Sequence, residues 1–186
     1  MSTKDHQSEP IESASETLQR IFDGHGSVLG SQMADESSRY DVLKKTDFPK
    51  PQRTRRIAVA NQKGGVGKTT STVNTAAALA NKGAQVLVID MDPQGNASTA
   101  LGVSHASGEP SVYDVIEGRS DLGDVITVCP DFPTLDVVPA SIDLSGAELE
   151  VADLPNRNTL LKEALDLYLR QSDKHYDYVF IDCPPS

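Results

Sequence analysis

The sequence predicts a doubly wound α/β domain with a mainly parallel sheet, and three observations support this. Short, uninterrupted apolar runs at residues 57–60, 86–89 and 178–181 are typical of strands covered on both faces, as in a parallel sheet. Segments with helical periodicity lie between these runs, and alternating strands and helices build doubly wound sheets. Each run is followed by a polar loop. Because ligands of open α/β sheets bind at the carboxyl ends of the strands, we expect the three loops to converge on one site.

The first two elements are a strand at 57–60 and a helix from about Gly67 to Asn81, joined by a glycine-rich turn. The helix is expected because four apolar side chains share one of its faces: Val73, Ala76, Ala77 and Ala80. Gly83 supplies its stop. A second strong strand follows at 86–89.

Weaker patterns fill the interval before the third strong strand. They predict helices at 112–117, 143–153 and 159–170, and a strand at 135–138. The predicted domain therefore extends over residues 56–186.

Residues 1–55 have a different character. They are rich in Ser, Asp, Glu and Gly and show no sustained period, so we expect a mostly disordered leader. One stretch, Ile11–Phe22, has apolar side chains roughly on one face and is a candidate nascent or partner-binding helix. The leader ends in a basic cluster of Arg53, Arg55 and Arg56.

The composition restricts the class of protein. With 38% apolar and 24% charged residues, the chain is expected to be globular and soluble. It has no run of about 18 apolar residues that would span a bilayer and no secretory signal at its N-terminus, so we expect a cytoplasmic protein with no membrane partner. Residues 56–186 hold 9 Lys and Arg against 18 Asp and Glu. This acidic balance argues against a broad nucleic-acid surface within the predicted domain.

The most informative segment is Lys63–Thr70, with the sequence KGGVGKTT. Its glycines let successive backbone N–H groups turn inward toward phosphate oxygens, and the positive end of the following helix adds to the attraction. Lys68 would neutralise the β- and γ-phosphates, and the Thr69 hydroxyl would bind magnesium. The usual pattern is not strictly met, because Gln62 stands where the first glycine belongs. The segment predicts a site for ATP and Mg²⁺ whose nucleotide-binding residues are Gly64, Gly65, Val66, Gly67, Lys68, Thr69 and Thr70.

This segment resembles the deviant Walker A motif, K-G-G-x-G-K-[ST]-T, of the ParA/MinD group of ATPases, and Lys63 matches its signature lysine. The resemblance implies a P-loop NTPase fold and an ATP-dependent homodimer in which two subunits enclose two ATP molecules. Lys63 would then reach the partner's phosphates and act in catalysis together with Lys68. Such a cation delivered in trans acts as an arginine finger does, by stabilising the charge that develops in phosphoryl transfer.

Three later segments also resemble ParA proteins: residues 88–98 (VIDMDPQGNAS), 139–148 (PASIDLSGAE) and 177–186 (DYVFIDCPPS). The resemblance implies that Asp92 orients the attacking water, that Asp182 holds a magnesium-bound water, and that Thr70 contacts the α-phosphate. Asp90 supports the magnesium shell or caps its own turn, and the sequence leaves both roles open.

The chain thus resembles the N-terminal part of the ParA family of chromosome and plasmid partition ATPases. The resemblance implies an ATPase that dimerises on ATP, binds DNA nonspecifically and works with a ParB-type adaptor at the nucleoid. The sequence stops directly after the third strong strand, so we expect a fragment with an incomplete sheet. Its DNA-binding part would be absent, and alone it would be inactive. Two alternatives are a MinD-like septum-positioning ATPase and an enzyme that activates a carboxylate of a small molecule.

Overall fold

The computed structural model describes residues 28–46, 48–144 and 159–185. The chain divides into two units, Met1–Phe48 and Pro49–Ser186. The first contains α2 (Val28–Lys45), whose last turn carries Lys44 and Lys45, a favourable place for positive charge. This helix lies within the stretch expected to be a mostly disordered leader and was not predicted from the sequence. The candidate helix Ile11–Phe22 lies outside the described residues.

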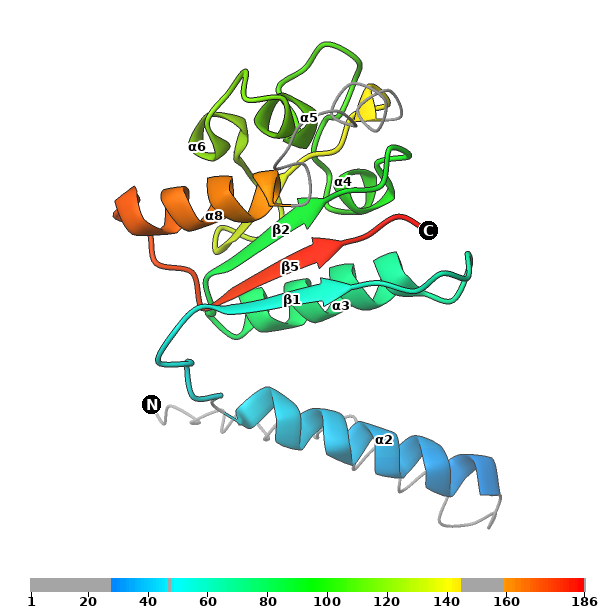
Figure 1. The fold of residues 1–186 in the computed structure, drawn as a ribbon. Coiled ribbons are helices and arrows are strands. Elements are labelled where there is room, and N and C mark those ends of the chain that lie inside the picture. The colour runs from blue at the N-terminus through cyan, green and yellow to red at the C-terminus, as the bar shows by residue number, and fades with distance from the viewer. Residues whose placement is uncertain (1–27, 47, 145–158, 186) are drawn as a thin grey trace, which may run out of the picture. The chain divides into compact units, whose positions relative to one another are not determined.

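The second unit is built on a five-stranded sheet (Figure 1). Its strands are β1 (Arg55–Val59), β2 (Val86–Asp90), β3 (Thr127–Val128), β4 (Leu135–Val138) and β5 (Tyr178–Asp182). Their order in space is β1-β5-β2-β4-β3, and all neighbours are parallel except β3 and β4. The predicted doubly wound α/β fold with a mainly parallel sheet is confirmed.

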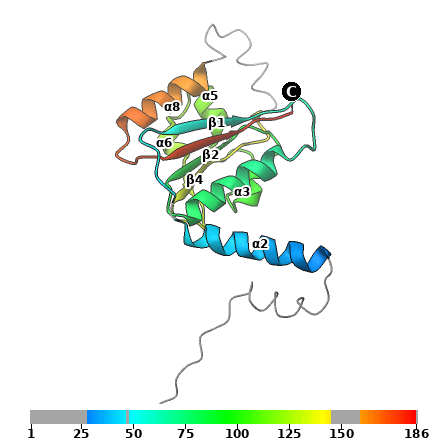
Figure 2. The ribbon, with the colours of Figure 1, turned by 90° about the horizontal axis from the view of Figure 1, so that it is seen from below.

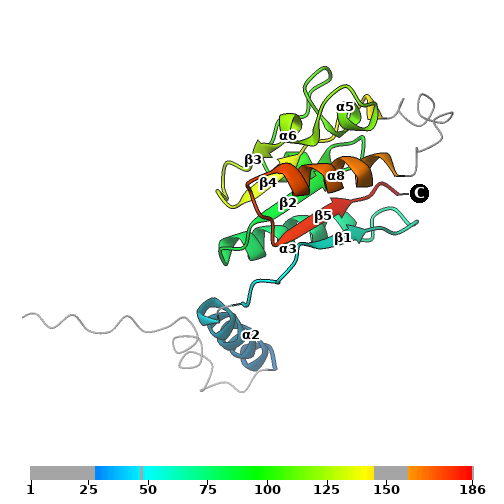
Figure 3. The same ribbon diagram turned by 60° about the vertical axis from the view of Figure 1, so that its left-hand side comes forward.

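Helices cover both faces of this sheet. They are α3 (Lys68–Asn81), α4 (Asn96–Ala100), α5 (Val112–Ile116), α6 (Leu122–Val125) and α8 (Leu160–Gln171). The view from below shows α3 on one side of the strands and α8 on the other (Figure 2), and α5, α6 and α8 lie together on the face opposite α3 (Figure 3).

The two helical layers are held by side chains that alternate along β2. Val86 and Val88 are buried in one apolar cluster with Ala76 and Ala80 of α3. Leu87 and Ile89 belong to a second cluster, which includes Val112, Val115, Leu122, Val125 and Leu165 from the three helices opposite. Because successive side chains of a strand point to opposite faces, the four apolar residues of β2 supply both cores.

The edge strand β1 departs from the sequence prediction. Among the described residues it pairs only with β5, and Arg55–Ala58 are exposed, with Ile57 at 36%. The expectation that each apolar run is covered on both faces holds for β2 and is wrong for β1. An edge position with little cover on either face is the physical reason.

The weaker predictions have mixed outcomes. The helices expected at 112–117 and 159–170 and the strand at 135–138 are confirmed as α5, α8 and β4. The helix expected at 143–153 lies almost wholly outside the described residues. The short elements α4, α6 and β3 were not predicted. Within the described part of the chain, no helix is long and apolar enough to cross a membrane.

Candidate nucleotide-binding site

The carboxyl ends of three neighbouring strands lie level with one another. In the β1–β5 and β2–β5 registers, Asp182 at the end of β5 stands opposite Val59 on one side and Asp90 on the other. The three polar loops predicted to converge therefore leave the sheet side by side, at the carboxyl ends of these strands.

The loop after β1 is shaped by its glycines. Gly65 and Gly67 adopt left-handed backbone angles, with φ of 71° and 85°, a conformation that glycine reaches without steric cost. Gly67 is the N-cap of α3 and offers no side-chain hydrogen bond to the helix. Because glycine has no side chain, Gly67 cannot cap the first backbone N–H groups of α3. Uncapped N–H groups at a helix start attract anions.

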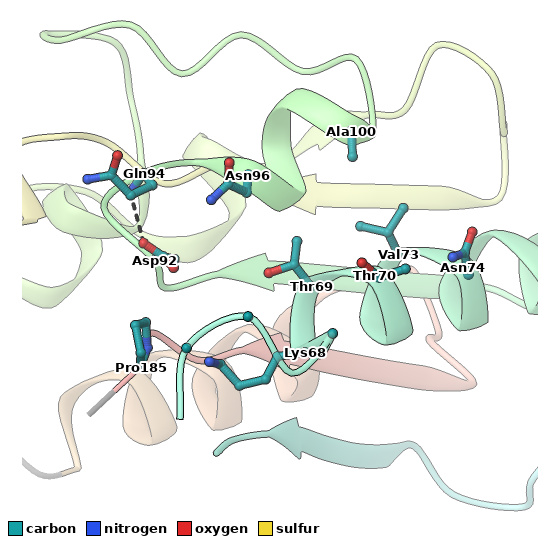
Figure 4. Close-up of a pocket in the computed structure, with 13 residues that line it drawn as sticks. Lys68, Thr69, Thr70, Val73, Asn74, Asp92, Gln94, Asn96, Ala100 and Pro185 are labelled. Atoms are coloured by element: carbon teal, nitrogen blue, oxygen red, sulfur yellow. Dashed lines mark hydrogen bonds between the residues drawn. The ribbon is translucent and has the colours of Figure 1, made fainter. Parts of the chain in front are cut away.

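These loops surround a cavity of about 740 Å³ (Figure 4), a size typical of ligand pockets. Of the predicted site residues, it is lined by Gly64, Gly65, Gly67, Lys68, Thr69, Thr70 and Asp92. The remaining lining residues are Val73, Asn74, Gln94, Asn96, Ala100 and Pro185. The predicted phosphate loop and the predicted catalytic aspartate thus line one space.

Those six further residues were not predicted from the sequence to belong to the site. A signal existed for some of them. Val73 and Asn74 lie one turn beyond Thr69 and Thr70 on the same helix, and residues three to four apart share a helix face. Gln94 belongs to the segment whose resemblance had already been noted.

Three predicted site residues do not line the cavity: Lys63, Val66 and Asp182. Lys63 and Val66 are exposed on the loop. The backbone N–H of Lys63 donates to Asn61 Oδ1 at 2.9 Å, which fixes the loop where it leaves β1. Asp182 lies at the end of β5 and is fully buried.

Asp90 has a structural role in the loop that carries Asp92. Its Oδ1 accepts the N–H of Asp92 at 3.1 Å, and its Oδ2 accepts both the N–H and the hydroxyl of Ser98 at 2.8 Å. Of the two roles left open by the sequence, these contacts favour capping of the turn and of α4. Burial raises the pKa of Asp90, and the hydrogen bonds from Ser98 oppose this shift.

Asp92 is presented to the cavity by its own tight turn. Its Oδ1 accepts the N–H of Gln94 at 3.0 Å (Figure 4), and its carbonyl accepts the N–H of Gly95 at 2.8 Å. Gly95 has a φ of 61°, and a Cβ atom there would lie 2.5 Å from His105 Nδ1. A glycine is therefore required where this loop enters α4.

The two carboxylate oxygens of Asp182 differ in their hydrogen bonding within the described residues. Oδ1 accepts the Thr72 hydroxyl at 3.0 Å, whereas the buried Oδ2 has no hydrogen-bond partner among the described residues. A buried acceptor without a donor is costly, by about 1–3 kcal/mol. A water bound to Mg²⁺ would supply that donor.

The donor set fits magnesium. The Thr69 hydroxyl lines the cavity, and no cluster of three or more His, Cys, Asp or Glu side chains occurs in the described ranges. Mg²⁺ usually keeps several waters and is held by few protein oxygens together with substrate phosphates. A hydroxyl and a water-mediated carboxylate are enough for such a site.

Known proteins match this chain at high identity. It is 48% identical over 130 residues to the sporulation initiation inhibitor protein Soj of Bacillus subtilis, covering 70% of this chain and 49% of Soj. It is 47% identical over 130 residues to the chromosome partitioning protein ParA of Caulobacter vibrioides, covering 70% and 48%. The chain thus spans about half the length of the curated relatives it matches.

A family model described as an AAA domain matches residues 54–186. The chain belongs to the ParA family of AAA-domain proteins. Among solved structures, this ParA-family chain resembles cobyrinic acid a,c-diamide synthase from Mycobacterium smegmatis, crystallised with an ATP analogue and magnesium. The TM-score is 0.64 at 40% identity, over 72% of this chain and 52% of the other. The match to the AAA-domain model begins at residue 54, one residue before β1.

Proposed function

We propose that this chain carries the phosphate- and magnesium-binding half of a partition ATPase that binds MgATP and hydrolyses it. The observation that carries the proposal is the single cavity that gathers Lys68, Thr69 and Asp92. The ATP analogue and magnesium in the similar solved structure support the choice of ligand.

Each residue has a role that follows from its position. The glycine-loop amides and Lys68 would hold the terminal phosphates, because they offer positive charge at the start of α3. Thr69 would bind Mg²⁺ directly and Asp182 would bind it through water. The ion would neutralise charge on the phosphates. Asp92 would orient the attacking water, since it faces the same cavity.

An ATP-dependent homodimer is part of the proposal. Lys63 is exposed and lies outside the cavity wall, although it directly precedes the loop residues that form it. A cation in that place is better suited to contact phosphates bound by the partner subunit than phosphates bound by its own subunit. Lys63 would then stabilise the transition state in trans.

The name of the Caulobacter relative supports a role in chromosome segregation, and a plasmid partition protein from Borrelia burgdorferi among the similar solved structures supports the same role for plasmids. We include in the proposal nonspecific DNA binding, a ParB-type adaptor, and a cytoplasmic, nucleoid-associated location. Residues 56–186 hold 9 basic against 18 acidic side chains, and affinity for DNA depends on Lys and Arg contacts with phosphates. The DNA surface would therefore lie outside these residues.

A second candidate function has one observation in its favour. The solved structure that is 40% identical to this chain carries the name of a cobyrinic acid a,c-diamide synthase. A phosphate loop can serve an enzyme of that kind by transferring the γ-phosphate to a substrate carboxylate, which activates it for attack by an amine. The same cavity would then hold ATP beside a small carboxylic acid.

One experiment separates the two functions. Phosphate release from MgATP is measured with the full-length protein alone, with nonspecific duplex DNA and adaptor, and with a panel of small carboxylic acids plus an ammonia donor. Slow turnover that DNA and adaptor stimulate supports the partition function. Turnover that depends on a carboxylic acid and yields an amide supports the alternative. Absence of nucleotide binding refutes both.

A further inference from the structure

A threonine inside α3 joins the phosphate-loop helix to the end of β5. The Thr72 hydroxyl lies 3.0 Å from Asp182 Oδ1 and 3.1 Å from the backbone oxygen of Lys68. Thr72 and Asp182 both have 0% of their surface exposed. The contact therefore forms inside the protein, one helical turn beyond the lysine predicted to bind phosphate.

The hydroxyl has a single proton and two acceptors within reach. In an α-helix, the carbonyl of residue 68 already accepts the backbone N–H of residue 72. A carboxylate is also the stronger acceptor of the two. We therefore assign the hydroxyl proton to Asp182 Oδ1.

This bond decides which oxygen of Asp182 remains available. With Oδ1 held by Thr72, the buried Oδ2 is the oxygen without a partner in the described part of the chain. Rotation of the carboxylate away from this orientation would break the bond from Thr72. The threonine thus fixes the orientation of the carboxylate before any ligand arrives.

We propose that Thr72 is a positioning residue for the magnesium site. It touches neither nucleotide nor metal, and it acts by holding Asp182 so that Oδ2 can accept a hydrogen bond from a magnesium-bound water. Partners that orient such ligands typically change metal affinity about 10–100-fold when they are removed. This role rests on the proposed MgATP function.

The test uses the full-length protein and two pairs of variants. Thr72→Val keeps the shape and removes the hydroxyl, and Thr75→Val is the matched control, because Thr75 is exposed on the same helix. In the second pair, Thr72→Ser keeps the hydroxyl and Thr72→Ala removes it. For each protein, ADP affinity is measured in EDTA, and the Mg²⁺ concentration that gives half of the magnesium-dependent thermal shift is then measured at saturating ADP.

The expected result is a loss of magnesium affinity alone. Thr72→Val and Thr72→Ala should need at least about tenfold more Mg²⁺, with ADP affinity in EDTA unchanged within about twofold. Thr72→Ser and Thr75→Val should match the unmodified protein. Unmodified magnesium dependence in Thr72→Val and Thr72→Ala would overturn the role of Thr72. So would an equal loss of metal-free ADP binding. Failure of the unmodified protein to bind ADP at all would overturn the proposed function, and this role with it.

Discussion

The carboxylate of Asp90 accepts the backbone N–H of Asp92 and so holds in place the residue expected to orient the attacking water. The same carboxylate also accepts two hydrogen bonds from Ser98 at the start of α4. One buried side chain thus sets the path of the loop on both sides of Asp92. Asp90 is a positioning group, and its burial has consequences for stability.

The first prediction concerns pH. Burial raises the pKa of Asp90 above its value in the unfolded chain, so its contribution favours the folded state most at pH below the unfolded pKa and is lost as pH rises through the folded pKa. The free energy of unfolding, compared with that of Asp90→Asn, should therefore fall as the pH is raised from about 4 upward. Urea unfolding of both proteins across this range measures the difference, and a difference that rises with pH would contradict it.

The second prediction concerns Lys68. Lys68→Ala should abolish detectable nucleotide binding, since it removes the positive charge nearest to the terminal phosphates. Fluorescence of a labelled ATP analogue measures this in the full-length protein. Lys162→Ala is the control, because Lys162 lies on α8 and forms an exposed ion pair with Asp166. Equal affinity of the two variants would refute the phosphate-loop assignment.

The third prediction concerns Lys63. Lys63→Gln should leave ATP binding by the monomer largely intact and should reduce both ATP-dependent dimerisation and turnover, because its charge would act on the partner's phosphates. Analytical sedimentation with and without MgATP gives the dimer fraction. A variant that dimerises and hydrolyses normally would remove Lys63 from the mechanism.

The fourth prediction concerns Asp92. Asp92→Ala should bind ATP and dimerise, but hydrolyse ATP at least about 10²-fold more slowly, since water positioning acts mainly in the transition state. The dimer should therefore persist long after ATP addition. Asp131→Ala, an exposed site far along the chain, is the control. Undiminished turnover in Asp92→Ala would show that another residue orients the attacking water.

The fifth prediction compares two glycines with positive φ. Gly83→Ala should cost about 1 kcal/mol of unfolding free energy, because its φ is 79° but nothing lies within 4 Å of the new Cβ. Gly95→Ala should cost more, because its Cβ would also clash with His105. In a His105→Ala background the cost at Gly95 should fall to that at Gly83. Equal costs in both backgrounds would show that His105 does not confine the loop.

The sequence was sufficient where local chemistry determines structure. The apolar runs of β2 and β5 and the glycine-rich turn at Lys63–Thr70 each specify one conformation, so both strands and the turn that leads into α3 were predicted correctly. The elements α4, α6 and β3 are only two to five residues long, too short for a periodic pattern. Helix α2 was missed because Val28–Lys45 has no continuous apolar stripe.

Contacts between distant residues could not be predicted from the sequence. Thr72 and Asp182 are 110 positions apart, and only the packing of α3 against β5 brings them together. The role of Asp90 was also undecided, because a carboxylate at a strand end serves a metal or a turn equally well until its neighbours are known. The two hydrogen bonds that Ser98 donates to Asp90 favour the role in the turn over the role at the metal.

The exposed edge of β1 affects how the protein behaves at high concentration. A strand with unpaired backbone groups along one side is a template for a strand of another molecule, and positively charged side chains on it oppose such contact. Arg55 and Arg56 lie at the beginning of β1, where Arg56 forms an ion pair with Asp166. Ile57 is partly exposed between them and the loop. Salt screens repulsion between charges. Self-association through β1 would therefore be held back by the charge of Arg55 in dilute buffer and favoured by high ionic strength, opposite to the usual effect of salt on DNA binding.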